Sequence, residues 1–385
     1  MIHYLFHYIC VLIIYLVYIY DIKKSKYNYE LTYNYVYWFL AFLIAIRYSV
    51  GVDTPKYMLA FYEIPKIQDL SWTDFVRFRF QPLYLITNSL CKSIYNNFVS
   101  LQILQSLLFF YSYNLICKHL NIRKFYLLFF FYLVTYFTTC MSAMRECFAL
   151  SFDLIALIFY FKRKWIYFYL FVFVAFMYHS GGIIFAILPL FNIVLHTMNT
   201  KNILLFFAGL VISIFCFSHF QAMLKSVLSD GSIARYSVTE NDLFSNIFNL
   251  FKNLMQFYFI YKLILQRKEF KENGHLIFIA LIYIFIDIIS ASILPIFYRF
   301  QSYFLVFYLL CIKLLFETRR LSFTTKIVIT VFFFYQPISR YISLFKDETS
   351  SQRLEYYCSV FTQDKRYYDK IIRESDASDY ILYLY

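Results

Sequence analysis

The chain alternates long apolar runs with short polar or charged stretches. Apolar runs of roughly 17–25 residues match the thickness of a bilayer core, and this length is typical of transmembrane helices. The pattern therefore predicts an all-α, polytopic bundle with about twelve spans. The expected spans are 4–20, 33–50, 98–117, 125–142, 146–161, 165–179, 181–195, 203–219, 246–265, 276–294, 300–316 and 326–342.

Segment 82–96 does not fit the spanning pattern as well as its neighbours. It carries Asn88, Lys92 and Asn96 at intervals of four residues, which places them on one face of a helix. This pattern favours an amphipathic helix that lies at the membrane interface. The alternative, that 82–96 spans the membrane, would place the basic loop 118–124 outside the cell, against the charge bias of bacterial membrane proteins.

Lysine and arginine in the short loops predict the orientation of the spans. One set of loops holds most of these residues, whereas the short loops on the other side hold only Arg145 and Arg299. We expect the basic set to be cytoplasmic. The basic set comprises Lys23, Lys24, Lys26, Lys118, Arg123, Lys124, Lys162, Arg163, Lys164, Lys201, Arg267, Lys268, Lys271, Arg319, Arg320 and Lys326.

This orientation divides the chain into a bundle and a tail. Residues 1–342 form the expected multi-pass bundle of a bacterial inner membrane, with segments 51–97 and 220–245 on the periplasmic side. Residues 343–385 form the expected periplasmic C-terminal tail. Amphipathic helices are expected within the periplasmic segments.

Composition excludes two other classes of protein. Hydrophobic residues make up 61% of the chain, more than the roughly 45–50% typical of soluble domains. The net charge is +13, but the cations punctuate apolar runs and form no basic groove, so we expect no nucleic-acid binding. The eight cysteines stand singly, without the spacing of a zinc site, and we expect no metal and no cofactor.

Several arginines gather on the expected outer face: Arg47, Arg145, Arg235, Arg299 and Arg340. An arginine near the bilayer costs free energy unless it is paired or solvated. Guanidinium groups bind phosphate through two parallel hydrogen bonds, so these residues could line a pocket for a lipid diphosphate. The alternative for each is an interface anchor that extends to the headgroups. Arg145 and Arg299 are the stronger candidates because they break the charge bias of their loops.

Acidic residues and one histidine supply candidates for proton transfer on the same face. His179 ends a span beside a glycine turn and could remove a proton from a sugar hydroxyl, or it could be satisfied by a backbone carbonyl. Asp53 and Glu146 are further candidates. Asp153 and Asp287 lie within expected spans, where an ionised group needs a partner.

Taken in order, these segments resemble the EpsG/Wzy-type polysaccharide polymerase family, from Arg47 to Phe361. No single motif is specific; the order and the spacing along a many-span chain carry the resemblance. The matching segments are 47–57 (RYSVGVDTPKY), 80–88 (FQPLYLITN), 141–149 (MSAMRECFA), 162–164 (KRK), 178–180 (YHS), 298–304 (YRFQSYF) and 356–361 (YYCSVF).

The chain departs from the family pattern at three places. Gln81-Pro82 stands where Glu-Pro is expected, Arg145-Glu146 stands where Arg-Gln is expected, and Tyr178 replaces a phenylalanine. Without a glutamate at position 81, the candidates for the general base shift to His179, Asp53 and Glu146.

The resemblance implies a GT-C-like fold and a metal-independent membrane glycosyltransferase. It would polymerise undecaprenyl-diphosphate-linked oligosaccharide repeat units at the periplasmic face, by transferring the growing glycan to the non-reducing end of a new unit. The product would be an O-antigen, a capsule or an exopolysaccharide, and a flippase and a chain-length regulator are expected partners. The implied catalytic residues are His179, Asp53, Glu146 and Arg145. The implied substrate-binding residues are Arg47, Arg145, Arg235, Arg299, Tyr57, Gln81 and Tyr303.

Two other functions remain open at this point. A flippase for the same lipid-linked sugar would need a cationic cavity open to either side, and such transporters commonly contain internal repeats, which this sequence lacks. A membrane O-acyltransferase could also use a histidine at the membrane face, but it would need a route for a cytoplasmic acyl donor.

Overall fold

A computed structural model describes residues 29–47, 53–122, 140, 143–190, 258, 279–280, 282–283, 286, 300–317 and 322. Within these ranges the protein is helical and contains no β-strand. The chain divides into two compact units, Met1–Ile183 with Gln336–Tyr385, and Ile184–Tyr335. Most of the residues with predicted functions belong to the first unit.

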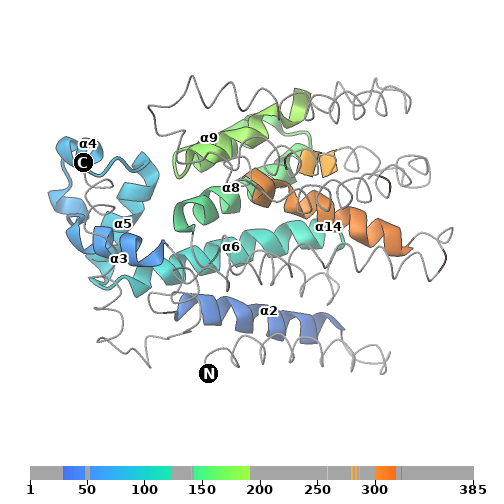
Figure 1. The fold of residues 1–385 in the computed structure, drawn as a ribbon, viewed down its shortest axis with the longest axis horizontal. Helices are drawn as coiled ribbons and strands as arrows, with labels where there is room; N and C mark the ends of the chain where they lie inside the picture. Colours follow the sequence, from blue (N-terminus) through green and yellow to red (C-terminus); the bar gives the residue numbers. More distant parts are fainter. Residues whose placement is uncertain are drawn as a thin grey trace, which may run out of the picture. The chain divides into compact units, whose positions relative to one another are not determined.

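Among the described residues of the first unit, a body of packed helices is formed by α2 (Tyr29–Ala45), α6 (Val99–His119), α8 (Met144–Phe161) and α9 (Trp165–Phe176). α6 packs against both α2 and α8, and α8 packs against α9 (Figure 1). Their buried positions are mostly apolar, and tertiary packing therefore supplies most of their stability. These helices confirm the all-helical class over the described part of the chain.

Short helices lie at one end of this body: α3 (Thr54–Glu63), the 3₁₀ helix η1 (Ile67–Asp69), α4 (Trp72–Arg77) and α5 (Pro82–Ile94) (Figure 1). Local sequence explains their boundaries. α3 stops where Ile64 precedes a proline and takes an extended conformation. A capping box between Ser71 and Asp74 starts α4, and Pro82 opens α5 after an extended Gln81.

α5 corresponds to the segment predicted to lie at the interface. It has 13 residues, which span about 20 Å and fall short of the roughly 30 Å of a bilayer core. Its length therefore agrees with the interfacial interpretation of 82–96.

A tight basic turn joins α8 to α9. Arg163 has a positive φ of 55°, and the N–H of Lys164 donates to the carbonyl of Phe159 at 2.9 Å, which ends α8 in the manner of a Schellman motif. The turn reverses the chain so that the two helices pack along their lengths, with Phe159 and Phe171 stacked at 5.3 Å. The sequence predicted this basic turn at 162–164.

After α9 the chain departs from the predicted α-helical span at 181–195. The 3₁₀ helix η3 (Ser180–Ile187) follows instead. Gly182 lies so close to α9 that a Cβ there would stand 2.8 Å from the carbonyl carbon of Ala175. Any larger residue would force the two segments apart, and glycine is therefore required for this approach.

The described helices test only some of the twelve predicted membrane spans. Among the described helices, α6 is long and apolar enough to cross a membrane, whereas Tyr33–Ala45, Trp165–Phe176, Ser180–Leu190 and Gln301–Cys311 are apolar but shorter. Predicted spans 4–20, 203–219 and 326–342 lie outside the described residues, as do most of 125–142, 246–265 and 276–294. The count of twelve and the GT-C-like arrangement remain predictions.

The second unit is described mainly through α14 (Gln301–Glu317). Its buried face carries Tyr303 and Phe304, whose rings lie 6.0 Å and 5.8 Å from the ring of Phe185. Tyr303 was predicted to bind substrate, and it is fully buried in this unit.

Candidate functional site

Arg145 is the second residue of helix α8 and reaches into the short helices at the end of the first unit. Its Nε lies 3.4 Å from the hydroxyl of Tyr57, and its Nη1 donates to Oε1 of Gln81 at 3.3 Å. The guanidinium carbon also lies 5.1 Å from the ring centre of Phe80 and 5.7 Å from that of Tyr57. A cation over aromatic faces is stabilised by the negative potential of the rings. The structure thus brings together three predicted residues, Arg145, Tyr57 and Gln81.

These contacts come from α3 and from the residues just before α5, and we call these two short helices the two arms of the site. Tyr57 comes from α3, and Gln81 immediately precedes α5, which begins at Pro82. Arg145 itself is half-buried, while both aromatic rings beneath it are nearly buried. The four contacts described above are made to two aromatic rings, a phenol hydroxyl and a neutral amide, and they orient the guanidinium.

Asp53 lies at the start of α3, one turn before Tyr57. Residues four apart occupy the same face of a helix, so the carboxylate and the phenol point to the same side of α3. Aspartate at this position commonly caps a helix, but Asp53 makes no side-chain cap hydrogen bond. The Asp53 side chain is half-buried.

A floor of aromatic side chains lies beneath the Arg145 cluster. The ring of Tyr84 on α5 meets the rings of Tyr57 and Phe148 edge-on, at 5.9 Å and 6.2 Å. Phe148 in turn stacks on Tyr178 at 5.1 Å. Burial raises the pKa of Tyr84 far above its ordinary value, so this phenol stays neutral and cannot serve as a base at physiological pH.

His179 is held close to the beginning of α5. The backbone N–H of Leu83 donates to the carbonyl of Met177 at 3.1 Å, and the hydroxyls of Thr87 and Tyr178 lie 2.8 Å apart. The Nδ1 of His179 accepts a hydrogen bond from the N–H of Gly181 at 3.1 Å. A ring nitrogen that accepts a hydrogen bond carries no proton, so the neutral ring holds its proton on Nε2 and donates from there. This arrangement favours a donor role over the predicted base.

Glu146 occupies the first turn of α8 and is nearly buried. A carboxylate at this position is stabilised by the positive end of the helix dipole. It is less exposed than Asp53, which makes Asp53 the better placed of the two acids to meet a substrate.

Arg47 lies inside the protein and not in a water-exposed pocket. Its side chain is fully buried, Nη1 donates to the carbonyl of Ile44 at 2.6 Å, and Nη2 donates to Oε1 of Gln105 at 2.8 Å. Gln105 also binds residue 140, because its Nε2 donates a hydrogen bond to the carbonyl of Cys140 at 3.0 Å. The location favours a structural role that ties α2, α6 and residue 140 together. Its predicted contact with a diphosphate remains a prediction.

Other predicted residues fall elsewhere. Arg235 and Arg299 lie outside the described residues, as do Arg340 and Asp287. Asp153 is fully buried in α8, and neither carboxylate oxygen has a hydrogen-bond partner. It therefore does not pair with Arg145 or with another arginine of the described part.

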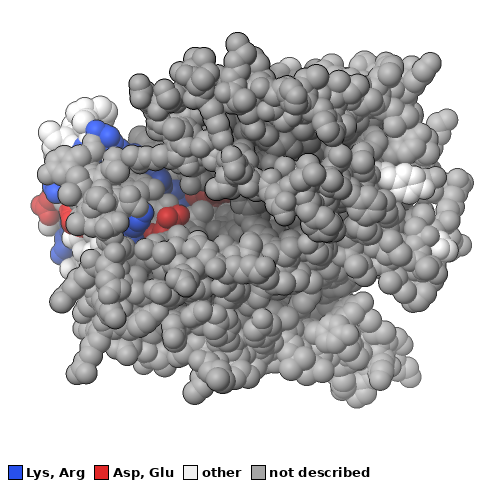
Figure 2. All heavy atoms as spheres, in the orientation of Figure 1, with Lys and Arg blue, Asp and Glu red and all other residues white. Residues whose placement is uncertain are grey.

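The short helices α3, α4 and α5 and the segments between them carry charged side chains on their surface. Figure 2 shows lysine, arginine, aspartate and glutamate side chains gathered over α3, α4 and α5. In the part of the chain that the structure covers, no group of three His, Cys, Asp or Glu side chains could hold a metal ion.

Sequence reasoning missed two residues of the site, Phe80 and Tyr84. Both lie in the segment 80–88 that contains Gln81. Because aromatic residues are frequent throughout this chain, the aromatic character of these two residues did not distinguish them. Phe80 could have been identified in the sequence because it immediately precedes Gln81, which was predicted to bind substrate.

Comparison with known proteins identifies one family. A model of the EpsG family matches residues 30–359, most of the chain. No curated protein and no solved structure matches it.

Proposed function

The chain belongs to the EpsG family, whose members are Wzy-type polysaccharide polymerases and exopolysaccharide biosynthesis proteins, and on this premise we propose that it polymerises lipid-linked oligosaccharide repeat units in the bacterial inner membrane. The donor is a growing glycan on undecaprenyl diphosphate, and the acceptor is a new lipid-linked unit. A flippase delivers the units and a chain-length regulator limits the product.

The observation that carries this proposal is the setting of Arg145. Its guanidinium rests on the rings of Phe80 and Tyr57 and is aligned by the neutral amide of Gln81. A planar, oriented and fully charged donor fork is suited to the oxygens of a diphosphate. Such a group stabilises the negative charge that builds up on the leaving group during transfer.

The reaction exchanges one bond for another. The acceptor hydroxyl oxygen forms a bond to the anomeric carbon of the donor, and the bond from that carbon to the diphosphate oxygen breaks. The lipid diphosphate leaves with the electron pair, and the hydroxyl proton passes to a base. The anomeric carbon gains oxocarbenium character on the way, as in glycoside cleavage.

Asp53 is the base in this proposal. It lies one turn before Tyr57 on the same face of α3, and its carboxylate is not used to cap that helix. A carboxylate so placed can accept the hydroxyl proton as the new bond forms. His179 donates from Nε2 to an oxygen of the substrate, in keeping with the hydrogen bond that its Nδ1 accepts.

The site faces the periplasm. Arg145 lies in the first turn of α8, and the basic turn Lys162–Lys164 follows the last residue of that helix. The helix has 18 residues and is about 27 Å long, close to the thickness of a bilayer core. If the basic turn is cytoplasmic, as the charge bias requires, Arg145 lies at the outer face.

We expect deletion of the gene to leave surface glycans that carry a single repeat unit, because units still reach the outer face but are not joined. The measurement is the size distribution of the surface polysaccharide, with the gene restored on a plasmid as the control. Complete loss of surface glycan with lipid-linked units retained inside would indicate a flippase. Chains of normal length that lack only acyl groups would indicate an acyltransferase.

A second expected result concerns His179. His179→Gln should keep most of the activity because the amide nitrogen can replace Nε2 as a donor, whereas His179→Ala should lower the rate by at least about tenfold. Both variants are compared as purified protein acting on lipid-linked units. Equal loss in the two variants would argue against the donor role and return His179 to the candidates for the base.

A further inference from the structure

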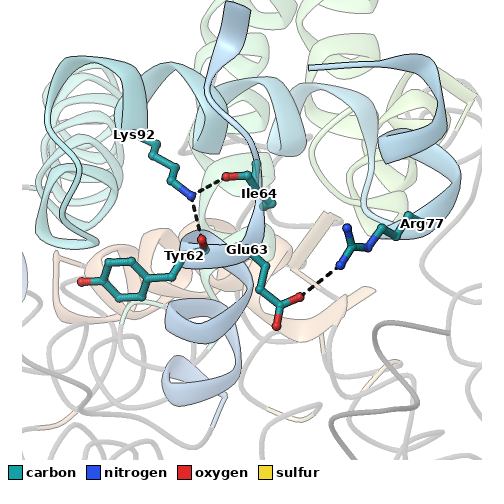
Figure 3. A network of polar contacts seen from close by, with 5 residues as sticks. All are labelled: Tyr62, Glu63, Ile64, Arg77 and Lys92. Atoms are coloured by element: carbon teal, nitrogen blue, oxygen red, sulfur yellow. Dashed lines mark hydrogen bonds and ion pairs between the residues drawn. The ribbon is translucent and has the colours of Figure 1, made fainter. Parts of the chain in front are cut away.

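Lys92 joins the far ends of the two arms that converge on Arg145. It lies in the last turn of α5, and its Nζ donates to the carbonyl of Tyr62 at 2.7 Å and to that of Ile64 at 2.6 Å (Figure 3). Both carbonyls belong to the C-terminal end of α3, where the last carbonyls of a helix lack partners within it. A cation at this end is also favoured by the helix dipole.

Neighbouring residues on the same face of α5 extend this connection. The hydroxyl of Ser89 donates to the carbonyl of Pro65 at 2.6 Å, and the hydroxyl of Ser93 accepts from the N–H of Ile67 at 2.9 Å. The end of α3 and the turn that follows it are therefore held along one face of α5. Lys92 supplies the charged bonds in this set, and bonds to a charged group are stronger than those between neutral groups.

The surroundings of Lys92 make its protonated form less favourable than it is in water. Burial lowers the pKa of Lys92, and the nearby charge of Lys66 lowers it further. Two short bonds to carbonyl oxygens offset this cost, because they favour the protonated amine.

The opposite ends of α3 and α5 hold Arg145. Tyr57 is on α3, about 10 Å from Ile64 along the helix axis. Gln81 immediately precedes α5 and lies about 16 Å from Lys92 along that helix. The contacts of Arg145 with the Tyr57 hydroxyl and the Gln81 amide, at 3.4 Å and 3.3 Å, are near the upper limit for hydrogen bonds. A small change in the angle between α3 and α5 would break one of them.

We propose that Lys92 is a positioning residue: by fixing the end of α3 to α5, it holds Tyr57 and Gln81 where both contact Arg145. The inference rests on the proposed function, since it assigns to Lys92 the placement of the group that binds the diphosphate. Lys92 acts through the two arms and does not touch the substrate.

The test uses full-length protein in liposomes and the lipid-linked single units that accumulate in the deletion strain. Lys92→Met removes both bonds at similar side-chain length and should lower kcat/KM by about tenfold to a hundredfold, mainly through KM. Lys92→Arg, which can still donate to both carbonyls, should recover most of it. The matched control is Arg77→Met, which removes an exposed ion pair at 3.7 Å between Arg77 of α4 and Glu63 of α3 (Figure 3) and should have little effect.

A double-mutant cycle separates positioning from general stability. If Lys92 acts through Tyr57, then Lys92→Met should add little to the loss already caused by Tyr57→Ala. Losses that add fully, or a Lys92→Met variant with wild-type KM, would overturn the inference. If Lys92→Met does not accumulate, Lys92→Gln enters the same cycle. Wild-type protein that joins no units would instead overturn the proposed function.

Discussion

Arg145→Ala should abolish polymerisation while the protein still reaches the membrane at normal levels. The substitution removes the one guanidinium that lies over Phe80 and Tyr57 and is aligned by Gln81. Loss of a single donor that stabilises developing negative charge typically costs about a hundredfold to a thousandfold in rate. Cells should then carry single-unit glycans, as in the deletion strain.

Arg145→Lys tests whether geometry matters beyond charge. Lysine retains the positive charge but lacks the planar fork, and it cannot hold the same aromatic and amide contacts together. We expect it to recover only a small part of the activity. Arg77→Ala is the control, because Arg77 is exposed and belongs to the same group of short helices. Polymers of wild-type length from Arg145→Ala would remove this residue from the mechanism.

Asp53→Asn should lower the rate of transfer by about a hundredfold to ten-thousandfold, because it removes the proton acceptor. Asparagine begins helices as well as aspartate does, so the start of α3 should not weaken. A loss of activity would then reflect the missing carboxylate and not a displaced Tyr57. The measurement is the rate at which purified protein joins lipid-linked units, under conditions in which substrate binding is saturated.

The control for this prediction is Asp69→Asn. Asp69 is exposed on η1, and the same chemical change there should leave the rate unaltered. If Asp53→Asn retains full activity and Glu146→Gln loses it, the role of the base passes to Glu146. The departure at Gln81 makes this comparison informative, because the amide at that position cannot accept a proton as a carboxylate would.

Much of the local structure was predictable because it depends on neighbours in sequence. The end of α3 before Pro65, the start of α5 at Pro82 and the basic turn after α8 follow from residues within one helical turn. Tyr57, Gln81 and Arg145 were all predicted to bind substrate from the motif segments that contain them. Nothing in those segments indicated that the three side chains would meet.

Two features were not predictable in this way. Arg47 has the pattern of an outer-face cation, yet α6 supplies Gln105 to bind it in the interior. Lys92 looked like a polar residue on an amphipathic helix, yet it bonds two carbonyls that lie 28 and 30 residues earlier in the chain. Both outcomes depend on partners far away in sequence.

The sequence by itself therefore determined that this protein is a helical membrane protein, where its short helices begin and end, and which family it belongs to. The length of an apolar run, a proline or a helix cap acts over neighbouring residues, so its effect can be read from the sequence. The order of the motifs can be read from the sequence in the same way. Only the tertiary structure decided that α3 and α5 converge on Arg145, that Arg47 is buried, and that Nδ1 of His179 accepts a hydrogen bond from Gly181. These depend on packing between segments, because a side chain's role is set by the atoms within a few ångströms of it and not by its place in the sequence.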